Sequence, residues 1–171
     1  MPHKREFNNS QKKLYSLFEK LNINGVTHFH PRLHTVDESK QWHDIIKGSH
    51  CKNLFLKDKK GNFILIVAHE DTQIKLNHLH KKIDTARLSF ANSEKLYEFL
   101  QVRPGSVTPY ALINAQPQSI KIILDDEMMQ QDILNFHPLE NWATTSIKPE
   151  QLITFIKSCG HDYKIVNFTQ V

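Results

Sequence analysis

Hydrophobic and polar residues alternate along the chain with two different periods, which predict helices interspersed with strands. Between Ser10 and Leu21 apolar side chains recur every three or four residues, as on one face of a helix, and Asn9 or Ser10 can cap that helix. Similar helical patterns occur in residues 37–46, 72–83, 93–100 and 149–160, and a short helix is expected from residue 125. Runs rich in β-branched and aromatic residues predict strands at 26–30, 53–58, 62–67, 120–124, 133–136, 142–147 and 163–168.

Two of these strands are expected to pair as a hairpin. Residues 53–58 and 62–67 are separated only by a short polar connection that ends in Gly61. The second strand is apolar almost throughout, which is typical of a strand buried on both faces. Because no linker, repeat or low-complexity segment interrupts the pattern, the sequence predicts one compact α+β domain over residues 1–171.

Composition restricts the classes of function without selecting one. A chain of 171 residues is long enough for one domain with a substantial core, and a net charge of +4 permits contact with nucleic acid without requiring it. Cys51 and Cys159 lie far apart and form no CxxC motif, which argues against a disulfide scaffold or a thiolate zinc site and fits a reducing compartment. The polar N-terminus has no apolar run behind it, and no apolar stretch approaches membrane-spanning length, so we expect a cytoplasmic protein without membrane contact.

The most unusual stretch is the loop of residues 102–110, in which two prolines bracket a Gly-Ser-Val-Thr core. Pro104 and Pro109 fix their own φ angles and push the residues before them toward extended backbone. Gly105 can adopt a positive φ or let another molecule approach the backbone closely. Such a loop can present amide N–H groups in fixed directions, which suits binding of a small oxygen-rich group. Taken alone, the stretch has a simpler interpretation as a stiff connector between a helix and a strand.

Two polar positions at strand ends carry chemistry that a binding site needs. Lys52 and Asn53 offer a cation and an amide suited to gripping a phosphate or an ester carbonyl. Adjacent strand residues point to opposite faces, so both are expected to serve one site only if the backbone there is irregular. His137, before a proline, suits holding a substrate oxygen, positioning water or transferring a proton. The simpler interpretations are a solvent-facing polar pair and a structural turn histidine.

Other reactive side chains lack the partners that their chemistry requires. The pairs His28/His30 and His78/His80 have no nearby cysteine or carboxylate at a recurrent metal-binding spacing. Cys51 has no glycine-rich elbow and no evident partner base, as a catalytic nucleophile requires. The acidic residues are dispersed and suggest no carboxylate pair. We therefore expect neither a metal site nor a cofactor.

Several blocks of residues together resemble one known family. The blocks follow in the expected order at residues 51–58, 87–91, 104–114, 135–139, 143–145 and 160–161, where the chain reads CKNLFLKD, RLSFA, PGSVTPYALIN, NFHPL, ATT and GH. They resemble freestanding prolyl-tRNA editing proteins, which are related to the YbaK proteins and to the editing domain inserted in bacterial prolyl-tRNA synthetases. The resemblance covers nearly the whole chain and implies a mixed, barrel-like β-sheet surrounded by helices.

The resemblance also implies an activity, partners and a set of site residues. The activity is trans-editing, in which the ester joining alanine to the terminal adenosine of mischarged tRNA(Pro) is hydrolysed with help from the substrate's 2′-hydroxyl and without a metal. The implied partners are the acceptor end of tRNA(Pro) and prolyl-tRNA synthetase. The catalytic residues it implies are Lys52, Asn53, Gly105 and His137. The residues it implies for substrate binding are the rest of the GxxxP loop, Ser106, Val107, Thr108 and Pro109. We expect the backbone N–H groups that this loop offers to support the developing oxyanion.

Amino-acid preference and tRNA recognition stay open at this point. The chain departs from commoner family residues at Arg103, Tyr110, Ala111, Ala115, Glu140 and Trp142. The alternatives are a deacylase for another small residue on tRNA, such as cysteine or serine, and a tRNA-binding module without turnover. The residues that form either a phosphate-contacting surface or a solvated face are Lys57, Lys59, Lys60, Lys81, Lys82 and Arg87.

Overall fold

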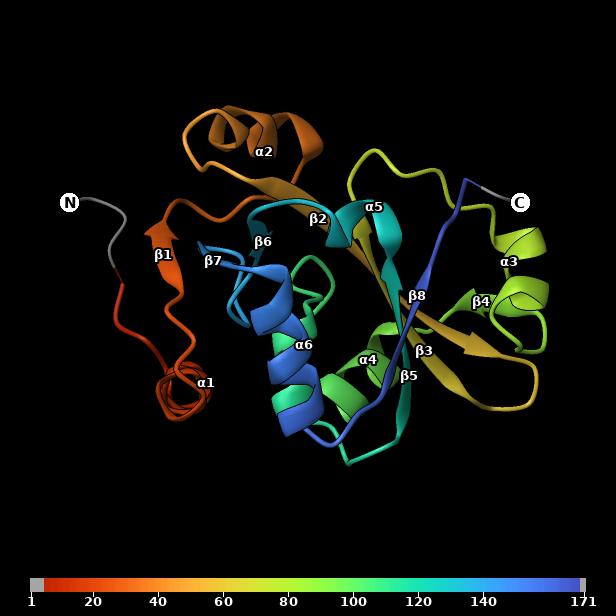
Figure 1. Ribbon diagram of the computed structural model, residues 1–171. Helices are drawn as coiled ribbons and strands as arrows, with labels where there is room; N and C mark the ends of the chain where they lie inside the picture. The colour runs from red at the N-terminus through yellow and green to blue at the C-terminus, as the bar shows by residue number, and fades with distance from the viewer. Residues whose placement is uncertain (1–4, 170–171) are drawn as a thin grey trace.

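The computed structural model describes residues 5–169 and shows helices around a mixed eight-stranded sheet (Figure 1), which confirms the single α+β domain expected from the sequence. The helices are α1 (Asn9–Lys20), α2 (Val36–His43), α3 (Leu76–Lys82), α4 (Ser93–Leu100), the 3-10 helix η1 (Pro109–Asn114), α5 (Asp126–Met129) and α6 (Pro149–Ser158). The strands are β1 (Val26–Phe29), β2 (Ser49–Asp58), β3 (Phe63–His69), β4 (Leu88–Phe90), β5 (Ile120–Asp125), β6 (Leu134–Phe136), β7 (Ala143–Ile147) and β8 (Tyr163–Val166). Within residues 5–169, no helix has the length and apolar character needed to span a bilayer.

The sheet contains both antiparallel and parallel pairs. Its strand order is β1-β7-β6-β2-β3-β5-β8, and β4 pairs with β2 beside this path. The predicted hairpin is confirmed, because β2 and β3 pair antiparallel over the whole stretch from Cys51 to Lys57. The pairs β2–β6, β3–β5 and β5–β8 are parallel. Parallel neighbours need long crossovers, which here carry the helices that cover the sheet.

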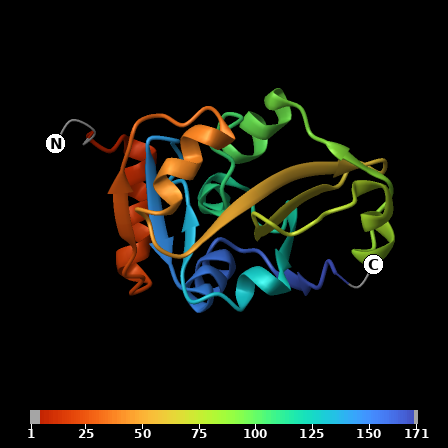
Figure 2. The same ribbon diagram turned by 90° about the horizontal axis from the view of Figure 1, so that it is seen from above.

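Strand β2 changes its neighbour along one edge. One edge of β2 pairs with β3. Along the opposite edge, Ser49 and His50 pair with β6, and Leu56 to Asp58 pair with β4. Between these two pairings lies the stretch 51–55. Figure 2 shows β2 as the long gold strand that crosses the molecule from α2 toward the hairpin tip. This strand therefore connects the two halves of the sheet.

Hydrophobic clusters cover both faces of the hairpin. Leu65 and Val67 of β3 enter one cluster, whereas Ile64 and Ile66 enter the other, and all four side chains are 0% exposed. Helices α1, α4 and α6 contribute to the first cluster and α3 to the second. The continuous apolar run in β3 thus reflects burial on both faces, as predicted.

Helix α3 is shorter than the sequence pattern indicated. It begins at Leu76, whereas the apolar spacing predicted helix from Thr72. The Thr72 hydroxyl is buried and donates to Asp125 Oδ2 at 2.6 Å, and the Lys52 ammonium donates to the Thr72 carbonyl. These tertiary contacts hold the segment before α3 out of a helix, which local periodicity does not report.

The starts of three further helices differ from the prediction, and one strand was not predicted. Asn8, Thr35 and Asn92 are the N-caps of α1, α2 and α4, and each side chain accepts a hydrogen bond from a backbone N–H three residues later. Each cap lies one or two residues before the position indicated by the sequence, because several polar residues with capping ability are adjacent there. The three-residue strand β4 was not predicted, since it is too short to show a period.

Candidate functional site

A cavity of about 590 Å³ lies where β2, the α2 segment and the residue after β6 meet. Lys52, Asn53, Gly105 and His137 all line it, so the structure brings together the four residues expected to act in catalysis. Further residues that line it are Trp42, His43, His50, Cys51, Glu70, Asp71, Asn135, Phe136 and Thr144. The site is therefore assembled from segments that are distant in sequence.

Lys52 and Asn53 both reach the cavity from a regular strand. They pair in register with Ala68 and Val67 of β3, so the expectation that an irregular backbone is needed was wrong. The physical reason is the position of the cavity along the edge of β2, in the stretch between the β6 and β4 pairings. A cavity at a strand edge can be lined by residues from both faces of the strand.

The polar atoms of this pair differ in their partners. The Lys52 ammonium donates to the Thr72 carbonyl, and its side chain is half-buried. Asn53 Oδ1 is buried and has no hydrogen-bond partner among residues 5–169. A buried amide oxygen without a donor costs free energy. Because this oxygen is shielded from solvent, the Asn53 side chain has to turn before Oδ1 can accept a hydrogen bond from a molecule in the cavity.

His137 is held in one neutral tautomer. Its Nδ1 lies 2.8 Å from the Ala143 carbonyl oxygen, and because a carbonyl only accepts, Nδ1 carries the proton. Burial lowers the pKa of His137, and the nearby rings of His30 and His50 act in the same direction. Its Nε2 is then left with a free lone pair, so the residue can accept a proton or a hydrogen bond from a ligand.

Two histidines beside the cavity connect α2 to β2. The rings of His43 and His50 stack with their centroids 3.9 Å apart, and His50 Nε2 donates to the Ile46 carbonyl at 3.0 Å. His43 Nδ1 also lies 3.6 Å from Glu70 Oε1. The rings of Trp42, His43 and His50 therefore form an aromatic wall on the α2 side of the cavity.

The proline-bracketed loop presents Gly105 to the cavity. Gly105 has a φ of +90°, and its N–H makes no hydrogen bond to any of residues 5–169. The Ser106 N–H is used inside the turn, where it donates to the Arg103 carbonyl at 3.0 Å. Thr108 caps η1 by accepting from the Tyr110 N–H at 3.2 Å.

The loop residues after Gly105 have a different location from the one expected for substrate binding. Ser106, Thr108 and Pro109 are buried and Val107 is half-buried, and none of the four lines the cavity in the described part of the chain. Pro109 starts η1, where its fixed φ suits the first helical position. In this arrangement these residues form the rigid support that positions Gly105.

Other reactive side chains are committed elsewhere or inactive. Burial raises the pKa of the Cys51 thiol to about 12, so it stays protonated and is a poor nucleophile. His30 places Nε2 2.8 Å from Thr144 Oγ1 and Nδ1 2.9 Å from the Pro31 carbonyl. Within residues 5–169, no three His, Cys, Asp or Glu side chains are grouped so as to hold a metal ion.

Several residues that line the cavity were not predicted from the sequence. Trp42 and His43 lie in a helix that was recognised, yet nothing in the sequence indicates that this helix faces the Lys52–Asn53 pair. His50 gave no signal of its own, and Thr144 was noted only as part of the family block at residues 143–145. The amphipathic pattern of residues 37–46, with a tryptophan beside a histidine, was the one feature that pointed toward them.

The buried histidines predict how stability depends on pH. Burial lowers the pKa of His50, His137 and His161, so below pH ~6.5 the unfolded chain binds more protons than the folded chain. We expect the melting temperature to be level from pH 8 to about 7 and to fall as the pH drops through ~6.5 toward 5. Thermal unfolding across this range measures it. His161→Gln should flatten the slope and His78→Gln, at an exposed position, should not; equal slopes for all three proteins would contradict the assignment.

Comparisons with known proteins agree with the family indicated by the sequence blocks. Residues 30–155 match the aminoacyl-tRNA editing domain. Prolyl-tRNA synthetase associated domain-containing protein 1 of Bos taurus is 40% identical over 145 residues, which cover 81% of this chain and 84% of that protein. Prolyl-tRNA editing protein ProX of Acetoanaerobium sticklandii is 31% identical over 150 residues, covering 86% and 91%.

A solved structure shows the same fold. The crystal structure of a candidate trans-editing enzyme for prolyl-tRNA synthetase matches with a TM-score of 0.72 and 16% identity, over 95% of this chain and 98% of that chain. The family match and the relatives above 30% identity each cover most of the chain. The chain therefore belongs to the aminoacyl-tRNA editing domain family, a family of deacylases that act on aminoacyl-tRNA.

Proposed function

We propose that this protein is a trans-editing hydrolase that cleaves the ester of mischarged Ala-tRNA(Pro). The observation that carries the proposal is the convergence of Lys52, Asn53, Gly105 and His137 on one cavity. The names of the relatives, a prolyl-tRNA editing protein and a prolyl-tRNA synthetase associated protein, support tRNA(Pro) as the carrier. A synthetase site that admits proline gains only ~1–3 kcal/mol against the smaller alanine, so a second, hydrolytic site is chemically necessary.

The terminal nucleotide and the amino acid are assigned to different ends of the cavity. A volume of about 590 Å³ exceeds what an alanyl group needs and leaves room for the terminal adenosine. The flat side chains of Trp42 and His43 suit stacking against a purine. The end near Gly105 and His137 then receives the alanyl group, and selection against the larger proline ring is assigned to the same end.

The reaction needs positioned water more than a strong nucleophile, because an aminoacyl ester is already activated. Water adds to the ester carbonyl, the bond to the 3′-oxygen breaks, and that oxygen takes a proton, giving free alanine and tRNA. The free N–H of Gly105 supports the carbonyl oxygen as it becomes negative. Asn53 Oδ1 accepts from the α-ammonium group or the 2′-hydroxyl, and Lys52 leaves the Thr72 carbonyl to grip a phosphate or ribose oxygen.

His137→Asn separates the chemical role of His137 from its structural one. Asparagine can still donate to the Ala143 carbonyl, as Nδ1 does at 2.8 Å, but it lacks the Nε2 lone pair. We expect a melting temperature within a few degrees of the native value and a loss of at least ~100-fold in kcat, the lower range for removing a positioned proton acceptor. His137→Ala, which also removes the donor, should lose stability as well. Full activity in His137→Asn would leave His137 a structural residue.

The proposed reaction is tested by measuring hydrolysis of Ala-, Pro-, Cys- and Ser-tRNA(Pro) side by side. Rapid loss of the alanyl ester with the prolyl ester intact is the expected result. Loss of the cysteinyl or seryl ester instead would move the specificity to that residue. Binding of tRNA without hydrolysis of any ester would replace the enzyme by a binding module.

Two further arms of the same assay test the mechanism. A substrate ending in 2′-deoxyadenosine should turn over much more slowly if the 2′-hydroxyl assists, and undiminished turnover would exclude that assistance. Activity should persist after treatment with a chelator, because the residues assigned here act without a metal. Loss of activity in chelator that added metal restores would contradict this.

A further inference from the structure

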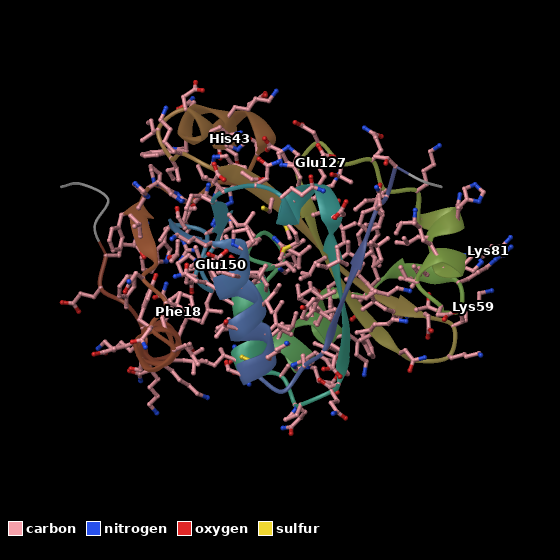
Figure 3. All side chains as sticks on the ribbon, viewed as in Figure 1. Phe18, His43, Lys59, Lys81, Glu127 and Glu150 are labelled. Atoms are coloured by element: carbon pink, nitrogen blue, oxygen red, sulfur yellow. The ribbon has the colours of Figure 1, made fainter. Side chains whose placement is uncertain are left out.

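A basic surface lies at the end of the molecule opposite α2. We define it as Lys57, Lys59, Lys60, Lys81, Lys82 and Arg87, which come from the end of β2, the last turn of α3 and the residue before β4. Figure 3 shows Lys59 and Lys81 projecting at the same edge of the molecule. The loop after α3 is tied to the hairpin, since the Lys59 N–H donates to the Arg87 carbonyl at 3.1 Å.

Five of the six cations of this surface form no ion pair within the described chain. The ion pairs among residues 5–169 involve other cations, so Lys57, Lys59, Lys60, Lys81 and Arg87 are exposed and form none. A concentrated positive surface of this kind favours a polyanionic partner.

Asp58, an acidic residue beside Lys57 and Lys59, is occupied, whereas Asp84 in the loop after α3 is exposed. Asp58 is 5% exposed and its carboxylate accepts hydrogen bonds from the backbone N–H groups of Lys60, Asn62 and Ala86 and from the Asn62 side chain. Hydrogen bonds from Asn62 and the backbone lower the pKa of Asp58 against the effect of burial. Asp58 thus fixes the shape of the surface while exposing almost none of its own charge.

The surface and the cavity lie along the same strand. Lys57 follows Asn53 by four residues in β2, and Lys59 follows it by six residues, in the turn after β2. At ~3.4 Å per residue, these separations correspond to ~14 and ~20 Å along the strand direction. Strand β4 also shares the edge of β2 on which the cavity opens. Stacked nucleotides rise by ~3.4 Å each, so these distances correspond to about four to six nucleotides from the 3′ terminus. The single-stranded end of a tRNA joins its acceptor stem over this range.

An exposed aromatic side chain lies between the two sites. Phe90 of β4 pairs with Leu56 and is 58% exposed, although large apolar side chains are usually covered. An exposed ring among basic groups provides a stacking surface for an unpaired base.

We propose that this basic surface binds the sugar–phosphate backbone of the tRNA acceptor stem while the cavity holds the 3′ end. The inference rests on the proposed function for its choice of tRNA. The contacts are made to phosphates, so they position the substrate and add affinity without reading its sequence.

The test compares two triple variants that remove the same charge. K59A/K60A/K81A removes three cations of the surface, and K12A/K13A/K20A removes three exposed cations of α1. Binding of a deacylated tRNA(Pro) acceptor-stem minihelix is measured as a function of salt. The first variant should bind about tenfold more weakly at low salt, with a slope of log K against log salt smaller by about two to three. The control should stay within about twofold, and equal effects in both variants would overturn the proposal.

A short substrate separates this inference from the proposed function. An aminoacylated CCA trinucleotide fills the cavity and does not reach the basic surface, so K59A/K60A/K81A should hydrolyse it at the native rate. Slower hydrolysis of the trinucleotide would overturn the proposal by showing that the variant alters the cavity. If the native protein hydrolyses neither substrate, the proposed reaction fails, while minihelix binding still decides the role of the surface.

Discussion

Replacing Lys52 with alanine is expected to lower kcat/KM for Ala-tRNA(Pro) by about 10- to 100-fold while leaving the fold intact. A hydrogen bond to a charged group is worth ~1.5–3 kcal/mol, and ~1.4 kcal/mol corresponds to a factor of ten. In the free protein the Lys52 ammonium donates to the carbonyl of the buried residue Thr72, so its loss should also cost ~1–3 kcal/mol of stability without unfolding the domain. Steady-state hydrolysis together with thermal unfolding measures both effects.

Two further lysine variants define what this result means. Lys52→Arg keeps the charge but spreads it over a planar fork, so it should recover part of the activity. Lys164→Ala removes an exposed lysine from β8 and should change nothing. An active Lys52→Ala protein would remove Lys52 from the site. A Lys52→Ala protein that is unfolded at the assay temperature would instead explain the lost activity by the lost support of the segment at Thr72.

Gly105→Ala keeps its backbone N–H but is expected to lose at least ~100-fold in kcat, because the added methyl group displaces the acyl group from this oxyanion donor. Two effects combine in this variant. A φ of +90° is strained for any residue with a side chain, at a cost of ~1–3 kcal/mol in stability. The added methyl group would approach only Asn141 Nδ2, at 4.0 Å, so it would meet open space rather than protein. Since Gly105 lines the cavity, that space is where the acyl group is placed.

Gly61→Ala provides the matched control for backbone strain. Gly61 has a φ of +84°, with nothing within 4 Å of an added Cβ, and it lies in the turn between β2 and β3. The two variants should therefore lose similar stability in chemical denaturation, but only Gly105→Ala should lose hydrolysis of an aminoacylated CCA trinucleotide. Equal activity in both variants would show that Gly105 has no role beyond its backbone conformation.

Features with a local cause were predictable from the sequence. The hairpin was predictable because glycine permits the turn at Gly61 and because the apolar run of β3 reflects burial on both faces. The starts of α1, α2 and α4 were predictable to within one or two residues, since their capping groups are local. The family was recognisable because its blocks are contiguous in sequence, including the loop at Gly105.

Features that depend on tertiary contacts were not predictable. The Thr72–Asp125 hydrogen bond delays the start of α3, and these two residues are 53 positions apart. The access of Lys52 and Asn53 to one cavity depends on which strands flank β2, and no period in the sequence encodes this. The α2 wall was missed for the same reason, because a helical pattern does not indicate the surface against which the helix packs.

Because β2 lies inside the sheet and α2 lies at the surface, the two elements should differ in their protection from local unfolding. Between Cys51 and Lys57 the strand is paired with β3, and its neighbours in the core are fully buried, so the amides that donate to β3 should exchange with solvent only when the whole domain unfolds. Residues 37–43 of α2 are exposed or half-buried and should exchange through cheaper local opening. The wall of the cavity can then open to admit a nucleotide while the strand that carries Lys52 and Asn53 stays in place. In the proposed reaction, the less stable α2 would thus admit the tRNA end, and the more stable β2 would align the ester.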